Sequence, residues 1–285
     1  MANTIGYGQV AVNNTNGFGK APTNNTIDFG EVCADSWSPE TNLVGGTSFF
    51  NTQSINLNGV DDFVTFGDIS DIENINTLSV GLWFKYDSIN TSADGLISKD
   101  VASGRIDGHW YVALQSNQVR FLLKTANGQD ALNSTTLTSG TWYHTLCVWD
   151  GSNMKIYING TLNNSISVTN ATGTLGSTSD DVRLGKRLST TGYYNGKMDE
   201  VAIWTNDQSS NASAMGSVPI DLSTYSPLHW WRCGDGDTAP ILTDNGSGSA
   251  NGTMTNFSTF SIEAPTLNPG TSTNMTEDSR KIATP

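Results

Sequence analysis

Positive charge is scarce in this sequence. Its 285 residues include 14 Lys and Arg against 27 Asp and Glu, which gives a net charge of −13. Because contacts to phosphate need clustered basic side chains, this imbalance argues against nucleic acid and against an anionic membrane surface as partners. Charged residues of either sign make up only 14% of the chain. The polar surface therefore consists of Asn, Ser, Thr and Gly, which favour turns and extended chain, so we expect little helix.

Cysteine is also rare. Cys33, Cys147 and Cys233 are far apart in the sequence, which excludes a dense disulfide framework and a zinc knuckle. Cys147 lies in an apolar run and is predicted to be a small buried hydrophobe. No apolar run approaches the roughly 20 residues of a membrane span, and the first residues carry no secretory signal pattern. We therefore expect no membrane insertion and folding in the cytoplasm.

Hydrophobic periodicity is nearly absent from residues 1–50. Residues 6–9 and 17–20 repeat a Gly-aromatic-Gly pattern, but two copies are too few for a solenoid. This region is either a low-complexity linker or an extended assembly arm. In the second interpretation its aromatic side chains, Tyr7 and Phe18, dock on a neighbouring chain.

The middle of the chain alternates apolar and polar residues in short runs that Gly, Asn and Asp interrupt. Such a pattern indicates an all-β sandwich or barrel. We divide the chain into an arm at 1–50, a sandwich at 51–263 and a tail at 264–285, with one short helix near 206–216. The strands are expected at 53–58, 62–66, 77–86, 95–99, 109–115, 117–124, 141–149, 154–159, 164–169, 182–186 and 194–204.

Five sequence blocks, taken in order, carry a resemblance to a known family. They lie at 57–64, 78–84, 142–160, 182–186 and 196–204. Together they resemble LamG-like jelly rolls, which have the antiparallel β-sandwich of the concanavalin A-like lectins and glucanases. Residues 228–233 and 244–256 resemble the segment that usually begins such domains. Because they follow the closing strand here, we expect a permuted closure in which 228–233 and 252–260 pair with the sheets.

The combination of this sandwich with the Gly- and Asn-rich arm resembles structural proteins of marine tailed bacteriophages. The resemblance implies a non-enzymatic virion protein, assembled in the host cytoplasm, that serves as a fibre, a decoration or a tail- or neck-associated part. Its implied partners are other virion proteins, further copies of itself and host-cell glycans. The alternatives are a free carbohydrate-binding lectin and, with less support, a glycoside hydrolase.

A structural calcium ion is common in the family at the edge where the first and last strands are neighbours. Asp61 and Asp199 match its positions best, with Asp62 as a substitute ligand, and carboxylate oxygens suit Ca²⁺. In the alternative, Asp61 caps a turn while Glu200 faces solvent.

Aromatic residues divide into two groups. Single tryptophans inside strand patterns are predicted to pack between the sheets; they are Trp83, Trp142, Trp149 and Trp204. Adjacent pairs should place one ring on each face, because side chains alternate along a strand. We therefore expect at least one of Trp110, Tyr111, Tyr193 and Tyr194 to be accessible to a glycan or a neighbouring subunit.

Motifs for catalysis are missing. A glycosidase needs two carboxylates about 5–10 Å apart across a cleft. The Glu-x-Asp-x-x-Glu strand of the sandwich glucanases does not occur here. None of the three histidines, His109, His144 and His229, follows a serine or cysteine elbow. The sequence therefore predicts a protein that recognises rather than reacts.

Overall fold

A computed structural model describes residues 4–6, 26–28, 49–89, 93–100, 104–187 and 192–266. The chain forms two compact units, Met1–Phe49 and Phe50–Pro285. In the first unit, strands β1 (Thr4–Gly6) and β2 (Thr26–Asp28) pair in parallel. The predicted arm residues Tyr7 and Phe18, and the tail beyond residue 266, lie outside the described residues.

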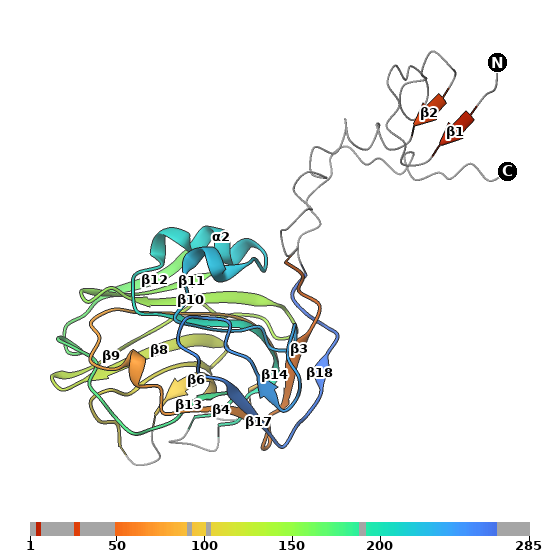
Figure 1. Cartoon of the computed structure of the whole chain (residues 1–285). Helices are drawn as coiled ribbons and strands as arrows, with labels where there is room; N and C mark the ends of the chain where they lie inside the picture. Colours follow the sequence, from red (N-terminus) through yellow and green to blue (C-terminus); the bar gives the residue numbers. More distant parts are fainter. Residues whose placement is uncertain are drawn as a thin grey trace. The chain divides into compact units, whose positions relative to one another are not determined.

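The second unit contains two eight-stranded antiparallel sheets that pack face to face (Figure 1). The first sheet has the order β12 (Thr161–Ser167), β11 (Asn153–Ile158), β10 (Tyr143–Trp149), β5 (Leu78–Ser88), β14 (Asn195–Trp204), β3 (Ser54–Asn58) and β18 (Phe260–Ser261), with β15 (His229–Trp231) also paired to β14. The second has the order β16 (Ile241–Leu242), β17 (Gly252–Thr255), β4 (Phe63–Gly67), β13 (Val182–Leu184), β6 (Asp94–Lys99), β7 (Trp110–Gln115), β8 (Gln118–Thr125) and β9 (Gly128–Asn133). The predicted all-β sandwich is confirmed.

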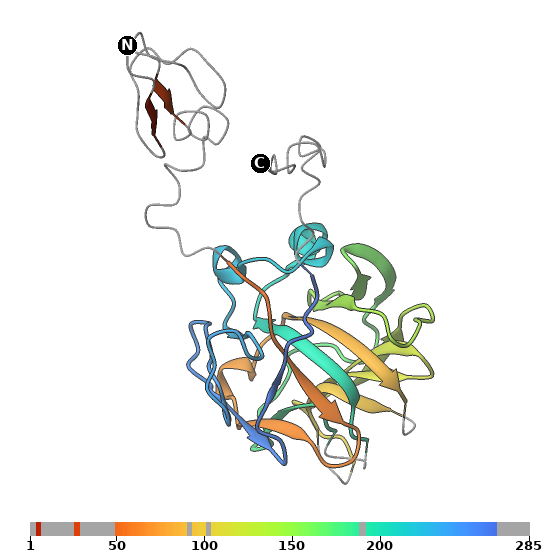
Figure 2. The ribbon, with the colours of Figure 1, turned by 90° about the vertical axis from the view of Figure 1, so that its right-hand side faces the viewer.

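The helical segments are short and mostly follow β14. Among the described residues they are the α-helix α2 (Ala212–Ser217) and the 3₁₀ turns η2 (Ser70–Ile72), η3 (Ser209–Asn211) and η4 (Leu222–Tyr225). Both ribbon views show α2 above the outer face of the first sheet (Figures 1 and 2). Among the described residues, no helix is both long and apolar enough to cross a membrane.

Strand alternation explains how the first sheet has two covered faces. In β5, the inward residues Leu78, Val80, Leu82, Phe84 and Tyr86 all belong to the core between the sheets. The residues between them face outward, where the segment 206–226 and the C-terminal residues cover them. This second layer is the reason that β5 is buried at almost every position.

The four single tryptophans do not share one location. Trp149 packs in the core, as predicted. Trp204 lies on the outer face over Gly81, and its indole N–H donates to the carbonyl of Tyr225. Trp83 and Trp142 are also outside the core cluster, so their predicted place between the sheets is wrong. The outer layer supplies an apolar environment that strand patterns cannot distinguish from the core.

The C-terminal segments join both sheets after the last long strand. β15 pairs with β14, β17 with β4, and β18 with β3. Trp231, from β15, stacks on Phe66, from β4, with ring centroids 4.0 Å apart. The last described segment therefore closes the sandwich.

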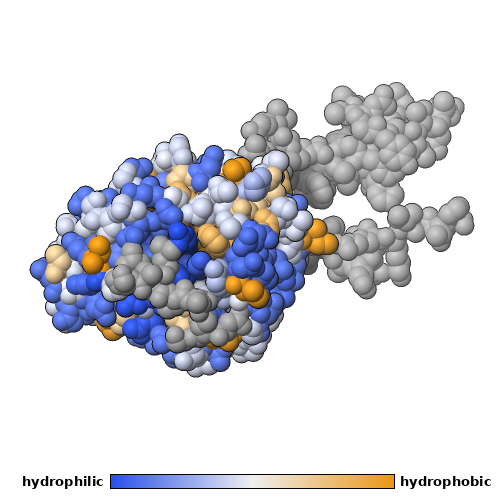
Figure 3. Space-filling view, turned by 90° about the horizontal axis from the view of Figure 1, so that it is seen from below, coloured by the Kyte–Doolittle hydropathy of each residue, from blue (hydrophilic) through white to orange (hydrophobic). Residues whose placement is uncertain are grey.

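Most of the described surface seen in Figure 3 is hydrophilic, and apolar side chains appear there as separate spots rather than as one patch. Exposed large apolar residues are scattered along the chain; they are Phe50, Val60, Ile106, Leu162, Ile241 and Ile262. Scattered apolar residues are normal on a globular protein and do not indicate an interface.

Candidate functional site

The predicted aromatic site residues are mostly enclosed. Trp110 and Tyr194 are 0% exposed and belong to the core, and Tyr111 is 3% exposed. Tyr111 does point outward from β7, but the Arg187 guanidinium covers its ring at 3.9 Å from the centroid. These three rings are therefore not accessible, two because they face the core and Tyr111 because its outward face is covered, so the expectation of at least one accessible ring rests on Tyr193.

Tyr193 is the member of this group that remains half-buried. Its hydroxyl accepts a hydrogen bond of 2.7 Å from Lys186, and the same ammonium lies 4.5 Å from the ring centroid. Tyr193 is thus bound to its own chain, in a bridge with Lys186. Its ring is partly accessible, but it does not line either of the two pockets described below.

The proposed calcium ligands lie at opposite ends of one strand pair. Met198 pairs with Ile55, so Asp199 lies beside the start of β3, whereas Asp61 follows the end of β3 at Asn58. The length of β3 separates them by about 13 Å at roughly 3.3 Å per residue. One Ca²⁺ with ligands at about 2.3–2.6 Å cannot reach both carboxylates, so the shared site is not formed.

Asp61 and Asp62 instead close the turn between β3 and β4. Asp61 accepts a hydrogen bond of 2.9 Å from the side chain of Asn58. Asp62 accepts one of 3.1 Å from the backbone N–H of Asn58. The sequence left open that Asp61 caps this turn through backbone N–H groups; in the structure Asn58 does so, since its side-chain oxygen accepts from the backbone N–H groups of residues 60–62. Within the described part of the chain, no three His, Cys, Asp or Glu side chains come together as a metal site.

Asp199 and Glu200 form a buried acidic pair, which corrects the expectation that Glu200 faces solvent. A β-bulge at this point of β14, with Glu200 at φ 48°, lets both neighbouring side chains turn away from water. Asp199 accepts from the side chain of Asn51 at 2.9 Å, and Glu200 accepts from the indole of Trp230 at 2.5 Å and from Arg232 at 3.2 Å.

Burial is the main cause of the raised pKa values of this pair. It raises the pKa of Asp199 well above its usual range, and the charge of Glu200 adds to the effect. It also raises the pKa of Glu200 to about 7, against the opposing pull of Arg232. Both carboxyl groups are enclosed by their own chain, so neither is presented to a ligand.

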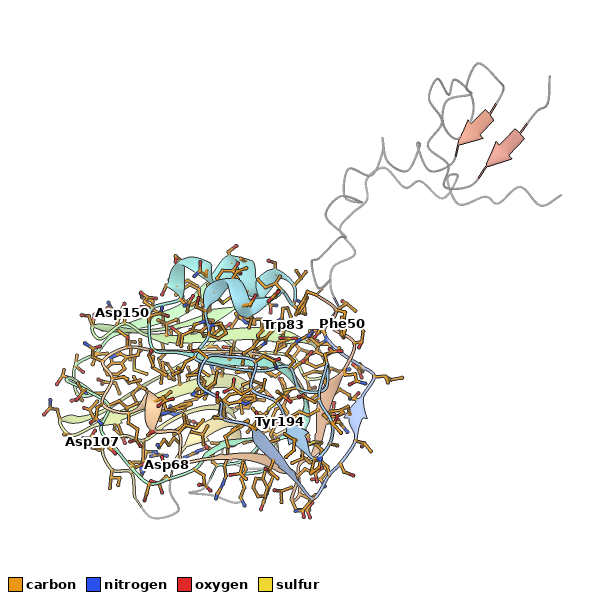
Figure 4. All side chains as sticks on the ribbon, viewed as in Figure 1. Phe50, Asp68, Trp83, Asp107, Asp150 and Tyr194 are labelled. Atoms are coloured by element: carbon orange, nitrogen blue, oxygen red, sulfur yellow. The ribbon has the colours of Figure 1, made fainter. Side chains whose placement is uncertain are left out.

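A pocket of about 480 Å³ opens on the outer face of the first sheet. Its size falls within the range of about 300–1,000 Å³ that small-ligand sites occupy. It is lined by Trp83, Trp142, Asn159, Gly216, Ser217, Val218, Pro265 and Thr266. Figure 4 shows Trp83 beneath α2, near the point where the chain enters the sandwich at Phe50. We call this site the tryptophan pocket.

Trp83 contributes to the pocket because of its outward position in β5. Its ladder neighbours are His144 on β10 and Asp199 on β14. The Trp83 and His144 rings are 5.3 Å apart. Complete burial lowers the pKa of His144 to about 3, so this imidazole is neutral beside the pocket.

The turn between β11 and β12 forms a second wall. Asn159 has a left-handed backbone with φ 48°, and its side-chain oxygen accepts from the N–H of His144 at 2.9 Å. Gly216, in α2, packs directly on Gly160, since a Cβ there would lie 2.0 Å from the Gly160 nitrogen. This close approach fixes the end of α2 against the turn and sets the position of Ser217 and Val218.

The last described residues complete the pocket. Asn51 donates to the carbonyl of Pro265 at 3.0 Å, and Ser54 donates to that of Glu263 at 2.6 Å. The Glu263 carboxylate also pairs with Lys85 and, at 3.3 Å, with Lys197. Side chains from three strands thus hold this segment across the outer face.

The tryptophan pocket combines rings with neutral polar groups. Trp142 is half-buried, and its indole N–H has no acceptor within the described chain. No described lining residue is an acid or a base. Two indoles with an amide and hydroxyls form the kind of apolar platform with a few polar groups that fixes a polyhydroxylated ligand. The sequence did not single this site out, because it treated Trp83 and Trp142 as core.

A second pocket, of about 420 Å³, contains a histidine–carboxylate pair of the kind that catalytic sites use. His229 shares a hydrogen bond of 2.7 Å with Asp244, while its other ring nitrogen has no partner among the described residues. Ser70 and Ser249 line the same pocket, but no hydrogen bond joins either to the imidazole. Since a nucleophile and its base should lie within hydrogen-bond reach, the pair serves to order residues 244–250 around β15.

The comparison with known protein families agrees with the fold. Residues 58–212 match the model of the family described as the concanavalin A-like lectin/glucanases superfamily. The chain belongs to this superfamily. Its LamG-like resemblance is thereby confirmed, whereas the relation to bacteriophage proteins remains a prediction.

Solved structures that resemble this chain do so at low sequence identity. A protein from Bacteroides ovatus, described as a candidate carbohydrate-binding protein, is 15% identical with a TM-score of 0.59 over 77% of this chain. The chain spans 62% of that protein's length. The carbohydrate-binding module CBM40 of the Ruminococcus gnavus IT-sialidase, bound to α2,3 sialyllactose, is 15% identical with a TM-score of 0.47, and 59% of this chain covers 98% of it. No curated protein matches the sequence.

The tryptophan pocket only partly coincides with the superfamily segment. Trp83, Trp142 and Asn159 lie inside the matched range, whereas Gly216–Val218 and Pro265–Thr266 lie beyond it. Part of the pocket wall therefore comes from segments that the family model does not cover.

Proposed function

We propose that this protein is a non-enzymatic carbohydrate-binding β-sandwich whose sugar site is the tryptophan pocket. The observation that carries the proposal is the convergence of Trp83 and Trp142 with Asn159 and Ser217 in one pocket. Indole rings offer apolar faces for sugar rings, and the amide and hydroxyl groups offer partners for sugar hydroxyls. The description of the Bacteroides ovatus protein as a candidate carbohydrate-binding protein supports this class of ligand.

The positions of the acids favour binding over hydrolysis. No described residue that lines the tryptophan pocket is a carboxylate, whereas glycoside hydrolysis uses two of them on either side of the bond. The carboxyl groups of Asp199 and Glu200, the acidic pair next to the pocket, accept hydrogen bonds from groups of their own chain.

We further propose that the sandwich is an adhesive part of a bacteriophage virion, assembled in the host cytoplasm and displayed in several copies beside other virion proteins. The support is the resemblance of the arm and sandwich together to phage structural proteins. A free lectin is the alternative. Antibodies against the sandwich should label purified particles and not the soluble fraction of a lysate; the opposite distribution would favour the free lectin.

A glycan array with the full chain tests the sugar site. We expect binding to at least one saccharide, and Trp142→Ala should weaken it at least about tenfold, as removal of a central aromatic contact does at an interface. Tyr193→Ala is the matched control, because it removes a half-buried ring that does not line the tryptophan pocket. Unchanged Tm values in both variants would show that the fold is intact. Equal binding by the wild type and Trp142→Ala would refute the proposed site.

A further inference from the structure

All the described residues that line the tryptophan pocket are uncharged. The polar groups of its described lining residues are two indole N–H groups, an amide, hydroxyls and backbone. The Trp142 N–H has no acceptor in the described chain but is itself buried, whereas the side-chain nitrogen of Asn159 makes no hydrogen bond to the described chain. The Ser217 hydroxyl donates to the carbonyl of Ser213 at 2.7 Å, which leaves its lone pairs free to accept.

The ionisable side chains next to the pocket do not line it, because they are buried or paired with one another. His144 and Asp199 flank Trp83 in the sheet but are 4% and 0% exposed. Lys85, two residues after Trp83 on the same face of β5, is directed to Glu263 and does not line the pocket. Lys197 shares that carboxylate.

We infer that the ligand of the tryptophan pocket is an uncharged saccharide, and that the pocket discriminates against sugars that carry a carboxylate or a sulfate. The inference rests on the proposed function and specifies its ligand. Sugar hydroxyls both donate and accept, so they match the Asn159 amide N–H and the Ser217 oxygen together. An anionic group would lose part of its hydration without finding a cation among the lining residues, which disfavours its binding. The net charge of −13 adds long-range repulsion.

Matched pairs of oligosaccharides test this inference with the full chain. Each pair should have the same linkage and differ only at C6, such as a glucoside and its glucuronide or a galactoside and its galacturonide. We expect the acidic member to bind at least about tenfold more weakly by calorimetry. The Kd of the neutral member should be the same at 50 mM and 500 mM salt, because no ion pair contributes.

A charge-gain variant sharpens the test. Ser217→Lys places a cation at the pocket wall and should raise the affinity for the acidic member at least about fivefold, while the neutral member changes less. Ser210→Lys is the matched control, since Ser210 is exposed in η3 and does not line the pocket. It adds the same charge to the molecule and should leave both affinities unchanged.

The outcomes separate the two proposals. If acidic sugars bind as tightly as their neutral partners and Trp142→Ala abolishes the binding of both, the neutral-ligand inference is overturned and the sugar site stands. Sugar binding that survives Trp142→Ala, or no binding to any saccharide, would overturn the site itself and this inference with it.

Discussion

At the scale of single residues, the two faces of β5 show how much depends on what covers a side chain. Leu82 and Trp83 are neighbours, and both are buried. Leu82 packs between the sheets, whereas Trp83 lies under the outer layer and lines a pocket. The same logic applies to Tyr111, whose outward ring is covered by Arg187. Burial of an aromatic residue in this protein therefore does not identify its role.

The acidic pair makes a prediction about pH at this scale. Because burial raises the pKa of Glu200 to about 7 from 4.5, the folded state binds a proton more tightly than the unfolded state. This contribution to stability is complete below about pH 4.5 and is lost as the pH rises through 7. Asp199 is shifted in the same direction.

We therefore expect the free energy of unfolding to fall between pH 5 and pH 8, with a slope on the order of 1 kcal/mol per pH unit. Urea unfolding at several pH values measures it, and Glu200→Gln should flatten the curve. A control, Asp71→Asn, alters an exposed acid and should keep the wild-type slope. Stability that rises with pH over this range would contradict the assignment.

At the scale of elements, the segment after β14 gives this sandwich its particular form. The residues between β14 and β15 cover the outer face of the first sheet, and β15, β17 and β18 pair with three earlier strands. One continuous stretch of chain thus completes the core, protects sheet edges and supplies two walls of the tryptophan pocket. We therefore expect stability and the proposed ligand binding to be coupled through this stretch.

Truncation measures that coupling. A chain that ends after Ser226 loses the β17 partner of β4 and the stacking of Trp231 on Phe66, so inter-sheet core and a strand edge become exposed. We expect loss of cooperative thermal unfolding and strong binding of a hydrophobic dye. A chain that ends after Thr266 retains β18 and the pocket wall and should melt as the full chain does. A wild-type Tm in the shorter chain would show that the closing strands are dispensable.

At the scale of the whole molecule, the sandwich contains its complete apolar core within one unit. The core cluster runs from Ile55 to Met254, and the superfamily match begins at residue 58. Surface charge is low and net negative, and polarity is supplied largely by uncharged side chains. Such a module can recognise neutral ligands without attracting nucleic acid.

Deletion of residues 1–48 tests whether the first unit serves assembly. The Tm of the sandwich should change by less than about 2 °C, because every residue of the core cluster remains. Glycan binding should also persist, whereas incorporation into particles should be lost. Normal incorporation of the deleted chain would refute an assembly role, and a large loss of Tm would show that the first unit belongs to the folding unit.

The sequence alone determined the fold class, because period-2 alternation and turn residues act locally and the five family blocks appear in order. It also indicated that 228–233 and 252–260 carry strand patterns. It could not place Trp83, since alternation gives the face of a strand but not the layer that covers it. Nor could it bring Pro265 beside Asn51, or separate Asp61 from Asp199 along β3. Those relations depend on register and on contacts between distant segments, which only the tertiary structure decides.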